Sequence, residues 1–236
     1  MIEWPAHWPT SVTMSPIRRS EILKRHGIAP APKRSQNTTW KEFISAHLAV
    51  LAGTDFFTVE VLTWRGLVPY YVLFFLHLES RRVTLGGITR HPTEAWITQM
   101  ARNAVDDIDG ALLGTRVFAL HDRDTKFCNS FQTMLKSSGV QPILLPPRSP
   151  NLNAFAERWV RSIKEECLSK LILVGEASLR RTATEFTKHY HHERNHQGKE
   201  NRLLFPISAS RRSRPKSPVI ARERLGGLLK FYQHAA

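Results

Sequence analysis

Three acidic residues stand in local contexts that suit a metal-binding site. Asp55 lies in Thr-Asp-Phe-Phe-Thr, Asp122 lies between an apolar run and Arg-Asp, and Glu157 lies in Asn-Ala-Phe-Ala-Glu-Arg. Divalent cations such as Mg²⁺ prefer oxygen ligands. Two such ions held close together can activate an attacking oxygen and stabilise a leaving one. If the fold brings the three acids together, they could therefore support transfer at a phosphodiester.

The sequence alone leaves a simpler alternative open. The chain has 20 Asp and Glu residues, so any one acid can equally be a helix cap, a turn residue or a surface charge. The elements that carry the acids favour the catalytic interpretation. Asp55 starts a strand whose alternation puts Asp55, Phe57 and Val59 on one face. Asp122 follows the strand Val117 to Leu120, at the end where open sheets bind ligands.

The third acid opens a long helix, expected over about 151–170. Glu157 shares a face of this helix with Arg161 and Lys164, which follow it at helical spacing. The stripe that we expect to pack inward consists of Leu152, Ala156, Trp159, Ile163 and Cys167. This pattern directs Glu157 away from the helix's own core contacts.

The remaining periodicity predicts a mixed sheet between helices. Strands are expected at 56–62, 68–78, 82–89, 115–120 and 140–145, and helices at 15–26, 40–51, 93–106, 129–138, 151–170 and 176–192. Short connections make the first three strands an antiparallel meander, and alternating units after it place helices on both faces. Thr93 and Asn129 are the expected helix caps. Residues 207–224 are expected to be irregular and 225–232 to form a short last helix.

Composition points to a polyanionic partner. The 236 residues carry a formal net charge of +14, and Lys and Arg side chains bind phosphates with release of counterions. Two cysteines cannot form a disulfide framework. The start of the chain has no secretory pattern, and the longest apolar run, 67–78, contains Pro69 and is too short to span a bilayer. We expect a cytoplasmic protein that acts on DNA and does not enter a membrane.

Five segments resemble motifs of the retroviral-integrase superfamily, in particular the integrase-core (DDE-type) transposases of bacterial insertion sequences. They are Asp55–Thr58, Leu78–Val83, His121–Phe127, Ser149–Arg158 and Tyr190–Gly198. The resemblance implies a ribonuclease-H-like α/β fold with a mixed five-stranded sheet flanked by helices. It also implies DNA 3′-end processing and strand transfer with two Mg²⁺ or Mn²⁺ ions per site. Its ligands would be Asp55, Asp122 and Glu157, and its partners the element ends, target DNA and further copies of the chain.

The sequence departs from this family in places. Positions 123–156, 34 residues, separate Asp122 from Glu157, one fewer than usual, which a loop can absorb. Asp124 replaces a glycine and could compete as a ligand, although Asp122 follows the strand directly. By resemblance, residues 1–35 are a truncated helix-turn-helix remnant and linker, 40–206 the catalytic core, and 207–236 a basic tail.

Basic residues and histidines gather near these motifs. The candidate DNA contacts are Arg123, Lys126, Arg148, Arg158, Arg161 and Lys164, with a solvated charged face as the alternative. His189, His191, His192 and His196 fit helix-end packing and proximity to DNA better than a metal site, because no recognised ligand spacing accompanies them. Two further functions remain open: a non-catalytic DNA-binding transposase remnant, or a nuclease of the same fold that cuts without joining.

Overall fold

A computed structural model describes residues 27, 40–112, 118–145, 154–206 and 218–234. The expected helix at 15–26, the first residues of the strand expected at 115–120, Arg148 and Leu152 lie outside the described residues. The chain divides into two units, Met1–Glu42 and Phe43–Ala236. The strands β1 to β7 all belong to the second unit.

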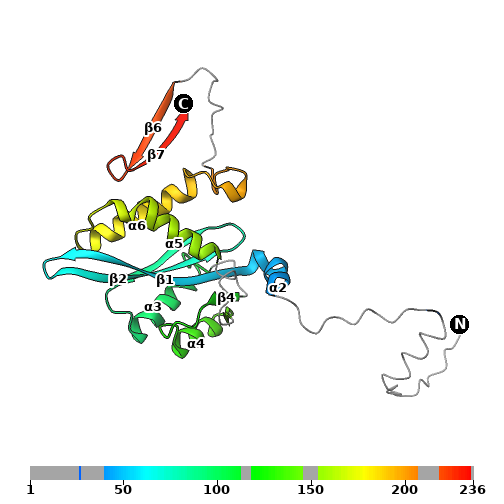
Figure 1. The fold of residues 1–236 in the computed structure, drawn as a ribbon. Coiled ribbons are helices and arrows are strands. Elements are labelled where there is room, and N and C mark those ends of the chain that lie inside the picture. Colours follow the sequence, from blue (N-terminus) through cyan, green and yellow to red (C-terminus); the bar gives the residue numbers. More distant parts are fainter. Residues whose placement is uncertain (1–26, 28–39, 113–117, 146–153, 207–217, 235–236) are drawn as a thin grey trace, which may run out of the picture. The chain divides into compact units, whose positions relative to one another are not determined.

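A five-stranded mixed sheet forms the centre of this unit (Figure 1). Its strand order is β3-β2-β1-β4-β5, with bounds β1 Leu51–Thr63, β2 Gly66–His77, β3 Val83–Thr89, β4 Phe118–His121 and β5 Gln141–Leu144. β1, β2 and β3 form an antiparallel meander, and β4 pairs in parallel with both β1 and β5. The predicted meander and mixed sheet are confirmed.

The central strand starts earlier than the sequence suggested. The helix expected at 40–51 is α2, Trp40–His47, followed by a 3-10 turn at Leu48–Val50. β1 begins at Leu51, so Asp55 lies inside the strand and does not start it. Residues 51–54 are buried, and within them 52–54 pair with β2 on one side and 51–53 pair with β4 on the other. A strand covered on both faces carries a continuous apolar run, which periodicity cannot distinguish from a helix end.

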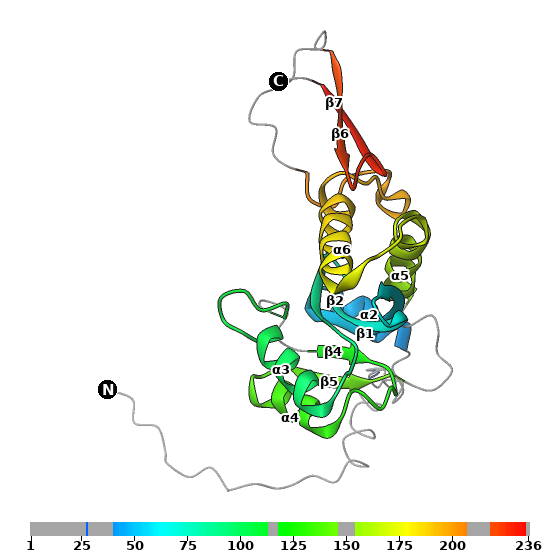
Figure 2. The same cartoon turned by 90° about the vertical axis from the view of Figure 1, so that its left-hand side faces the viewer.

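Helices cover both faces of the sheet. α3, Glu94–Ala104, and α4, Asn129–Ser137, lie on one face, and α5, Ala154–Glu166, and α6, Gly175–His192, lie on the other (Figures 1 and 2). On the α3/α4 face, β1, β2 and β4 contribute Ala52, Leu73, Phe75 and Ala119 to a buried cluster with Ile97, Ala101, Phe131 and Leu135. On the α5/α6 face, Trp159 packs with ring centroids 4.4 Å from Phe74 and 5.6 Å from Phe57.

One of the two expected helix caps is confirmed, and the other is wrong. Thr93 caps α3, and its hydroxyl accepts a hydrogen bond from the Trp96 backbone N–H at 3.3 Å. The expected cap at Asn129 is wrong. The extended residue before α4 is Cys128, which makes no side-chain cap bond, and Asn129 is the first helical residue. In the described part of the chain, no helix is long and apolar enough to cross a membrane.

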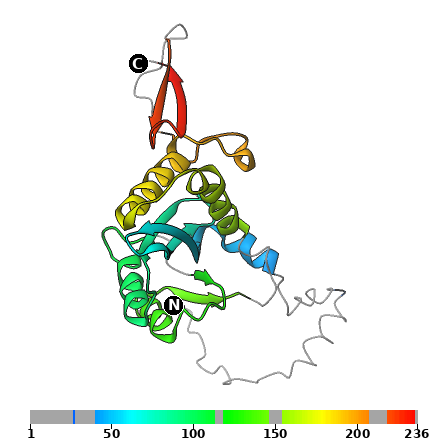
Figure 3. The same cartoon turned by 60° about the vertical axis from the view of Figure 1, so that its left-hand side comes forward.

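The C-terminal segment is a β-hairpin, which corrects two expectations. Val219–Arg224 forms β6 and Leu229–His234 forms β7, so 225–232 is not a helix and the irregular stretch does not extend to 224. Leu225, Gly226 and Gly227 have φ values of 52°, 67° and 89°. Glycine adopts this left-handed backbone at low cost, and the three residues close a turn where a helix would need negative φ. Figure 3 shows the hairpin beyond the end of α6.

One arginine connects the hairpin to α6. Arg224 donates to Glu193 at 2.7 Å and to Glu185 at 2.6 Å, and the Glu193 side chain is only 5% exposed. A hydrogen bond from Lys188 is the largest cause that lowers the pKa of Glu185, and the bond from Arg224 is the next. For Glu193, the bond from Arg224 is the largest cause that lowers the pKa. A nearly buried carboxylate that loses its cation becomes an uncompensated charge.

We therefore expect Arg224→Gln to release the hairpin. Hydrogen exchange of the amides at 219–234 should accelerate roughly 10-fold, because the charge-assisted bonds that hold the hairpin are removed. Arg180→Gln, at an exposed position of α6 itself, is the matched control and should leave exchange of the hairpin unchanged. Equal exchange rates in the two variants would remove Arg224 from this role.

Three of the histidines expected to pack at the end of α6 make hydrogen bonds there. His191 Nε2 accepts a hydrogen bond from the Val83 backbone N–H at 2.9 Å, which attaches α6 to β3. His192 donates to the Phe205 carbonyl and His196 to the Tyr190 carbonyl, both at 2.8 Å. Burial, and then neighbouring His192, lowers the pKa of His191 to about 4. The folded protein therefore keeps this ring neutral and accepting.

The low pKa of His191 predicts acid sensitivity. In the unfolded chain the ring binds a proton near pH 6.5, whereas in the folded chain it stays neutral down to about pH 4, so stability falls as pH drops through this window. Between pH 6.5 and pH 5 this group should remove about 1.6 kcal/mol from the free energy of unfolding.

Urea denaturation at the two pH values measures this decrease. His191→Gln should flatten the pH dependence by about that amount, whereas His91→Gln, at an exposed position, should leave it intact. A His191→Gln profile parallel to that of the unsubstituted chain would contradict the assignment.

Candidate active site

Asp55 faces the side of the sheet that α5 covers. Its neighbour Phe56 packs toward the opposite helices, with ring centroids 5.3 Å from Phe127 and 6.4 Å from Trp96. Phe57 packs against Trp159 of α5. Since side chains alternate along a strand, Asp55 shares the face of Phe57. The Asp55 side chain is half-buried, and its Oδ1 accepts a hydrogen bond from the Phe56 backbone N–H at 2.7 Å.

Strand register gives Asp122 a position that matches Asp55. β1 and β4 are parallel, and their last paired residues are Gly53 and Leu120. Asp55 and Asp122 each follow that pair by two residues. Alternation on β4 agrees with this placement, because the ring of His121 packs against Phe127 on the α4 side, with centroids 5.2 Å apart. The two aspartates therefore belong to the same face, on adjacent strands.

Local hydrogen bonds distinguish Asp122 from Asp124. Asp122 Oδ1 accepts from the Asp124 backbone N–H at 2.9 Å. The Asp124 carboxylate is engaged by Lys126, from its backbone N–H at 2.9 Å and from Nζ at 2.5 Å. Lys126 Nζ also lies 5.4 Å from the ring centroid of Phe56, on the face away from α5. Asp124 thus serves as the partner of Lys126, which favours Asp122 as the candidate ligand.

Glu157 lies in the first turn of α5 and is exposed. The helix buries Ala156, Trp159 and Ile163 against the sheet, as the sequence predicted for this stripe. Lys164, on the face of Glu157, places Nζ 6.0 Å from the ring centroid of Phe57. The face that carries Glu157 and Lys164 therefore borders the same side of β1 as Asp55.

The described residues bring these acids together only in part. Asp55 and Asp122 occupy matched positions on one face, and Glu157 belongs to the helix over that face. Among the residues that the structure describes, however, no group of three or more His, Cys, Asp or Glu is arranged to hold a metal ion. The roles of Asp55, Asp122 and Glu157 as ligands stay a prediction.

The candidate DNA-binding residues also differ from one another. Arg123, Arg158, Arg161 and Lys164 are exposed, whereas Lys126 is committed to Asp124. Arg148 lies outside the described residues.

Burial lowers the pKa of His121, next to Asp122, and its Nδ1 lies 2.8 Å from the Asp122 carbonyl oxygen. A neutral His121 adds no positive charge beside that aspartate.

A basic cavity of about 300 Å³ lies beside α5 and was not predicted. Its cationic lining consists of Arg81, Arg158, Arg194 and Lys199. The sequence motifs that contain Arg81 and Arg194 resemble family segments, but no role follows from the motifs themselves. Only the tertiary structure places the two motifs around one space.

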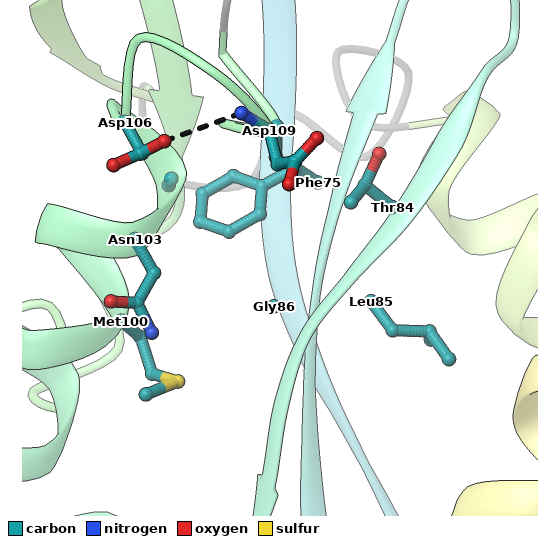
Figure 4. A pocket seen from close by; sticks show the side chains of 10 residues that line it. Phe75, Thr84, Leu85, Gly86, Met100, Asn103, Asp106 and Asp109 are labelled. Atoms are coloured by element: carbon teal, nitrogen blue, oxygen red, sulfur yellow. Dashed lines mark hydrogen bonds between the residues drawn. The ribbon is translucent and has the colours of Figure 1, made fainter.

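A second cavity, of about 360 Å³, lies on the other side of the molecule between β3 and α3 (Figure 4). Phe75, Gly86 and Met100 line it, together with Asp106 and Asp109 at its rim. Asp106 accepts a hydrogen bond from the Asp109 backbone N–H at 3.3 Å. None of the residues predicted from the sequence to be catalytic lines it, so it is separate from the candidate active site.

One stretch of the chain matches a known family model. Residues 138–202 match the family model of the integrase core domain. This stretch contains β5, α5 and α6, with Glu157 and the lining of the basic cavity that these helices contribute, but neither Asp55 nor Asp122, and it spans less than half of the chain. No curated protein matches the sequence.

Solved structures are similar at low sequence identity. A chain in the cryo-EM structure of the simian T-cell lymphotropic virus intasome with the PP2A regulatory subunit B56 gamma has a TM-score of 0.51 at 13% identity, over 77% of this chain and 65% of that chain. The HTLV-2 integrase catalytic core domain in complex with magnesium gives 0.49 at 13% identity, over 65% and 92% of the two chains. The BIV integrase core domain gives 0.45 at 15%, over 64% and 88%.

The fold is the ribonuclease-H-like fold expected from the sequence. The present chain spans less than two thirds of the intasome chain that it matches. Residues 138–202 thus carry an integrase-core match within a ribonuclease-H-like fold. Within this ribonuclease-H-like sheet, the candidate acids occupy the carboxyl end of β4, the neighbouring position on β1, and the helix of the integrase-core segment that packs above them.

Proposed function

We propose that the chain is a DDE-type transposase of a bacterial insertion sequence, which catalyses metal-dependent DNA cleavage and strand transfer. The observation that carries this proposal is the register of the parallel strands β1 and β4, which sets Asp55 on β1 level with Asp122 just beyond the end of β4, on the side of the helix that presents Glu157. The integrase-core match over residues 138–202 supports it. A chance set of surface acids would not be expected to share one sheet face and its covering helix.

The donor chemistry of the three acids suits Mg²⁺ or Mn²⁺, since carboxylate oxygens are the ligands that these ions prefer. Asp55, Asp122 and Glu157 would hold two ions per site. When bound, such ions supply charge neutralisation at the attacking and leaving oxygens. This assignment draws on the donor types and the sheet register, because the described residues form no complete three-ligand group.

The chain's own residues would position the DNA. Phosphoryl transfer needs little covalent help and depends mainly on alignment and electrostatics. The exposed Arg158, Arg161 and Lys164 follow Glu157 on α5 and can contact backbone phosphates near the site. Water would attack a phosphodiester at the element end and release a DNA 3′-hydroxyl. That hydroxyl would then attack a phosphodiester of the target and displace the target's own 3′-oxygen. Joining two element ends to one target requires two sites at once, so we propose a homo-oligomer assembled on DNA in the bacterial cytoplasm.

A strand-transfer assay tests the reaction. Purified protein is incubated with Mn²⁺, a supercoiled plasmid, and labelled duplexes that end in the terminal repeats flanking its gene. We expect labelled, joined plasmid. Nicked plasmid without joining would instead support the nuclease, and DNA binding without either product would support a non-catalytic remnant.

Paired substitutions test the aspartate assignment. Asp122→Asn should reduce joining by at least roughly 100-fold, because a carboxylate ligand is removed. The new amide oxygen can still accept the hydrogen bond from the Asp124 N–H, so folding and DNA binding should persist. Asp124→Asn is the matched control and should retain most of the activity. Joining that survives in Asp122→Asn but fails in Asp124→Asn would reverse the assignment.

A further inference from the structure

The basic cavity beside α5 combines three separate parts of the chain. Arg81 comes from the β2–β3 turn, Arg158 and Ser162 come from α5, and Tyr190, Arg194 and Lys199 come from the end of α6 and the segment after it. Arg158 directly follows Glu157, but it points along a different side of the helix, where Ser162 is its neighbour one turn on. The cavity therefore adjoins the candidate active site without sharing its acids.

Positive charge in this cavity is only partly neutralised. Arg194 pairs with Glu166, through bonds of 2.6 Å and 2.8 Å. Among the described residues, Arg81, Arg158 and Lys199 form no ion pair with a carboxylate. Burial is the main cause that lowers the pKa of the Arg81 guanidinium, Tyr190 opposes it, and the charge of Arg158 lowers it again. Like charges gathered around one cavity repel one another unless an anion joins them.

Arg81 is held in an unusual way. Its φ of 61° is uncommon for a residue other than glycine, and its backbone N–H donates to the His77 carbonyl at 2.9 Å in the turn. The guanidinium carbon lies 3.3 Å from the ring centroid of Phe155. Its Nε is buried and has no hydrogen-bond partner among the described residues. This contact places the guanidinium over the ring, and a buried donor without an acceptor is costly.

We infer that this cavity binds a backbone phosphate of DNA, in contact with Arg81, Arg158 and Lys199. Guanidinium groups match phosphate oxygens with paired N–H donors, and the ammonium of a lysine adds a point charge. The inference rests on the proposed function only for the identity of the ligand as DNA. A phosphate held here would fix the DNA strand alongside α5, so that Glu157 lies next to the neighbouring part of the backbone.

The salt dependence of DNA binding tests this inference. A fluorescein-labelled duplex is titrated with the full chain at several salt concentrations, and anisotropy gives the affinity. Arg81→Gln and Lys199→Gln should each weaken binding roughly 10-fold, as expected when a charge-assisted bond is removed. The slope of log affinity against log salt should become shallower by about 0.9 for each phosphate that the variant no longer neutralises.

Arg102→Gln is the matched control, with the same change of charge on α3, at the opposite face of the sheet. It should leave affinity and slope near those of the unsubstituted chain. Thermal unfolding of every variant checks the fold. If Arg81→Gln unfolds, Lys199→Gln decides the question, because Lys199 is exposed. Equal slopes for Lys199→Gln, Arg102→Gln and the unsubstituted chain would overturn the inference.

Calorimetric titration with inorganic phosphate separates a second source of the same ligand. Phosphate binding that disappears in Arg81→Gln, with unchanged DNA affinity, would make this a free-anion pocket and overturn the assignment to DNA. The outcome of the strand-transfer assay does not depend on the outcome of these binding measurements. DNA binding that depends on the cavity, without joining, would support the phosphate site and contradict the transposase reaction. Joining, with salt slopes that the substitutions leave unaltered, would support the reaction and contradict the phosphate site.

Discussion

Parallel pairing between β1 and β4 is the constraint on which the candidate active site depends. Leu51 pairs with Phe118 and Gly53 with Leu120, and this register places Asp55 and Asp122 at equal distances beyond the last pair. A slip of one residue would turn one aspartate to the opposite face, toward α3 and α4. Burial of the residues at 51–54 on both sides of the sheet makes such a slip costly, because it would expose the core and bury the acid.

Helix α5 connects the acidic and basic parts of the molecule. Its inward stripe, anchored by Trp159 against Phe57 and Phe74, fixes the rotation of the helix about its axis. That rotation sets Glu157 and Lys164 toward one side and Arg158 with Ser162 toward the basic cavity. A single packing contact thus determines where a carboxylate and a cation, adjacent in sequence, are presented. This is why a shift of α5 would alter both sites together.

Long, strongly periodic segments were predictable. The meander, the helices on both faces, the Thr93 cap and the inward stripe of α5 followed from apolar spacing and capping chemistry. Prediction failed where local pattern and tertiary pairing disagree. Residues 51–54 read equally well as the end of a helix, and only pairing with two neighbouring strands makes them β1. The hairpin at 219–234 depends on the left-handed backbone of residues 225–227 and on the ion pair between Arg224 and Glu193. Neither feature can be predicted from the spacing of apolar residues.

The sequence by itself determined the kinds of groups available: three acids in integrase-like motifs, a large positive charge, and alternating elements that build a mixed sheet. These properties depend on residue type and short-range spacing, so they can be read without coordinates. The tertiary structure alone decided that Asp55 and Asp122 share a face, that Asp124 belongs to Lys126, and that Arg81 meets residues more than a hundred positions later. Such relations arise from strand register and helix packing, which join residues that the chain keeps far apart.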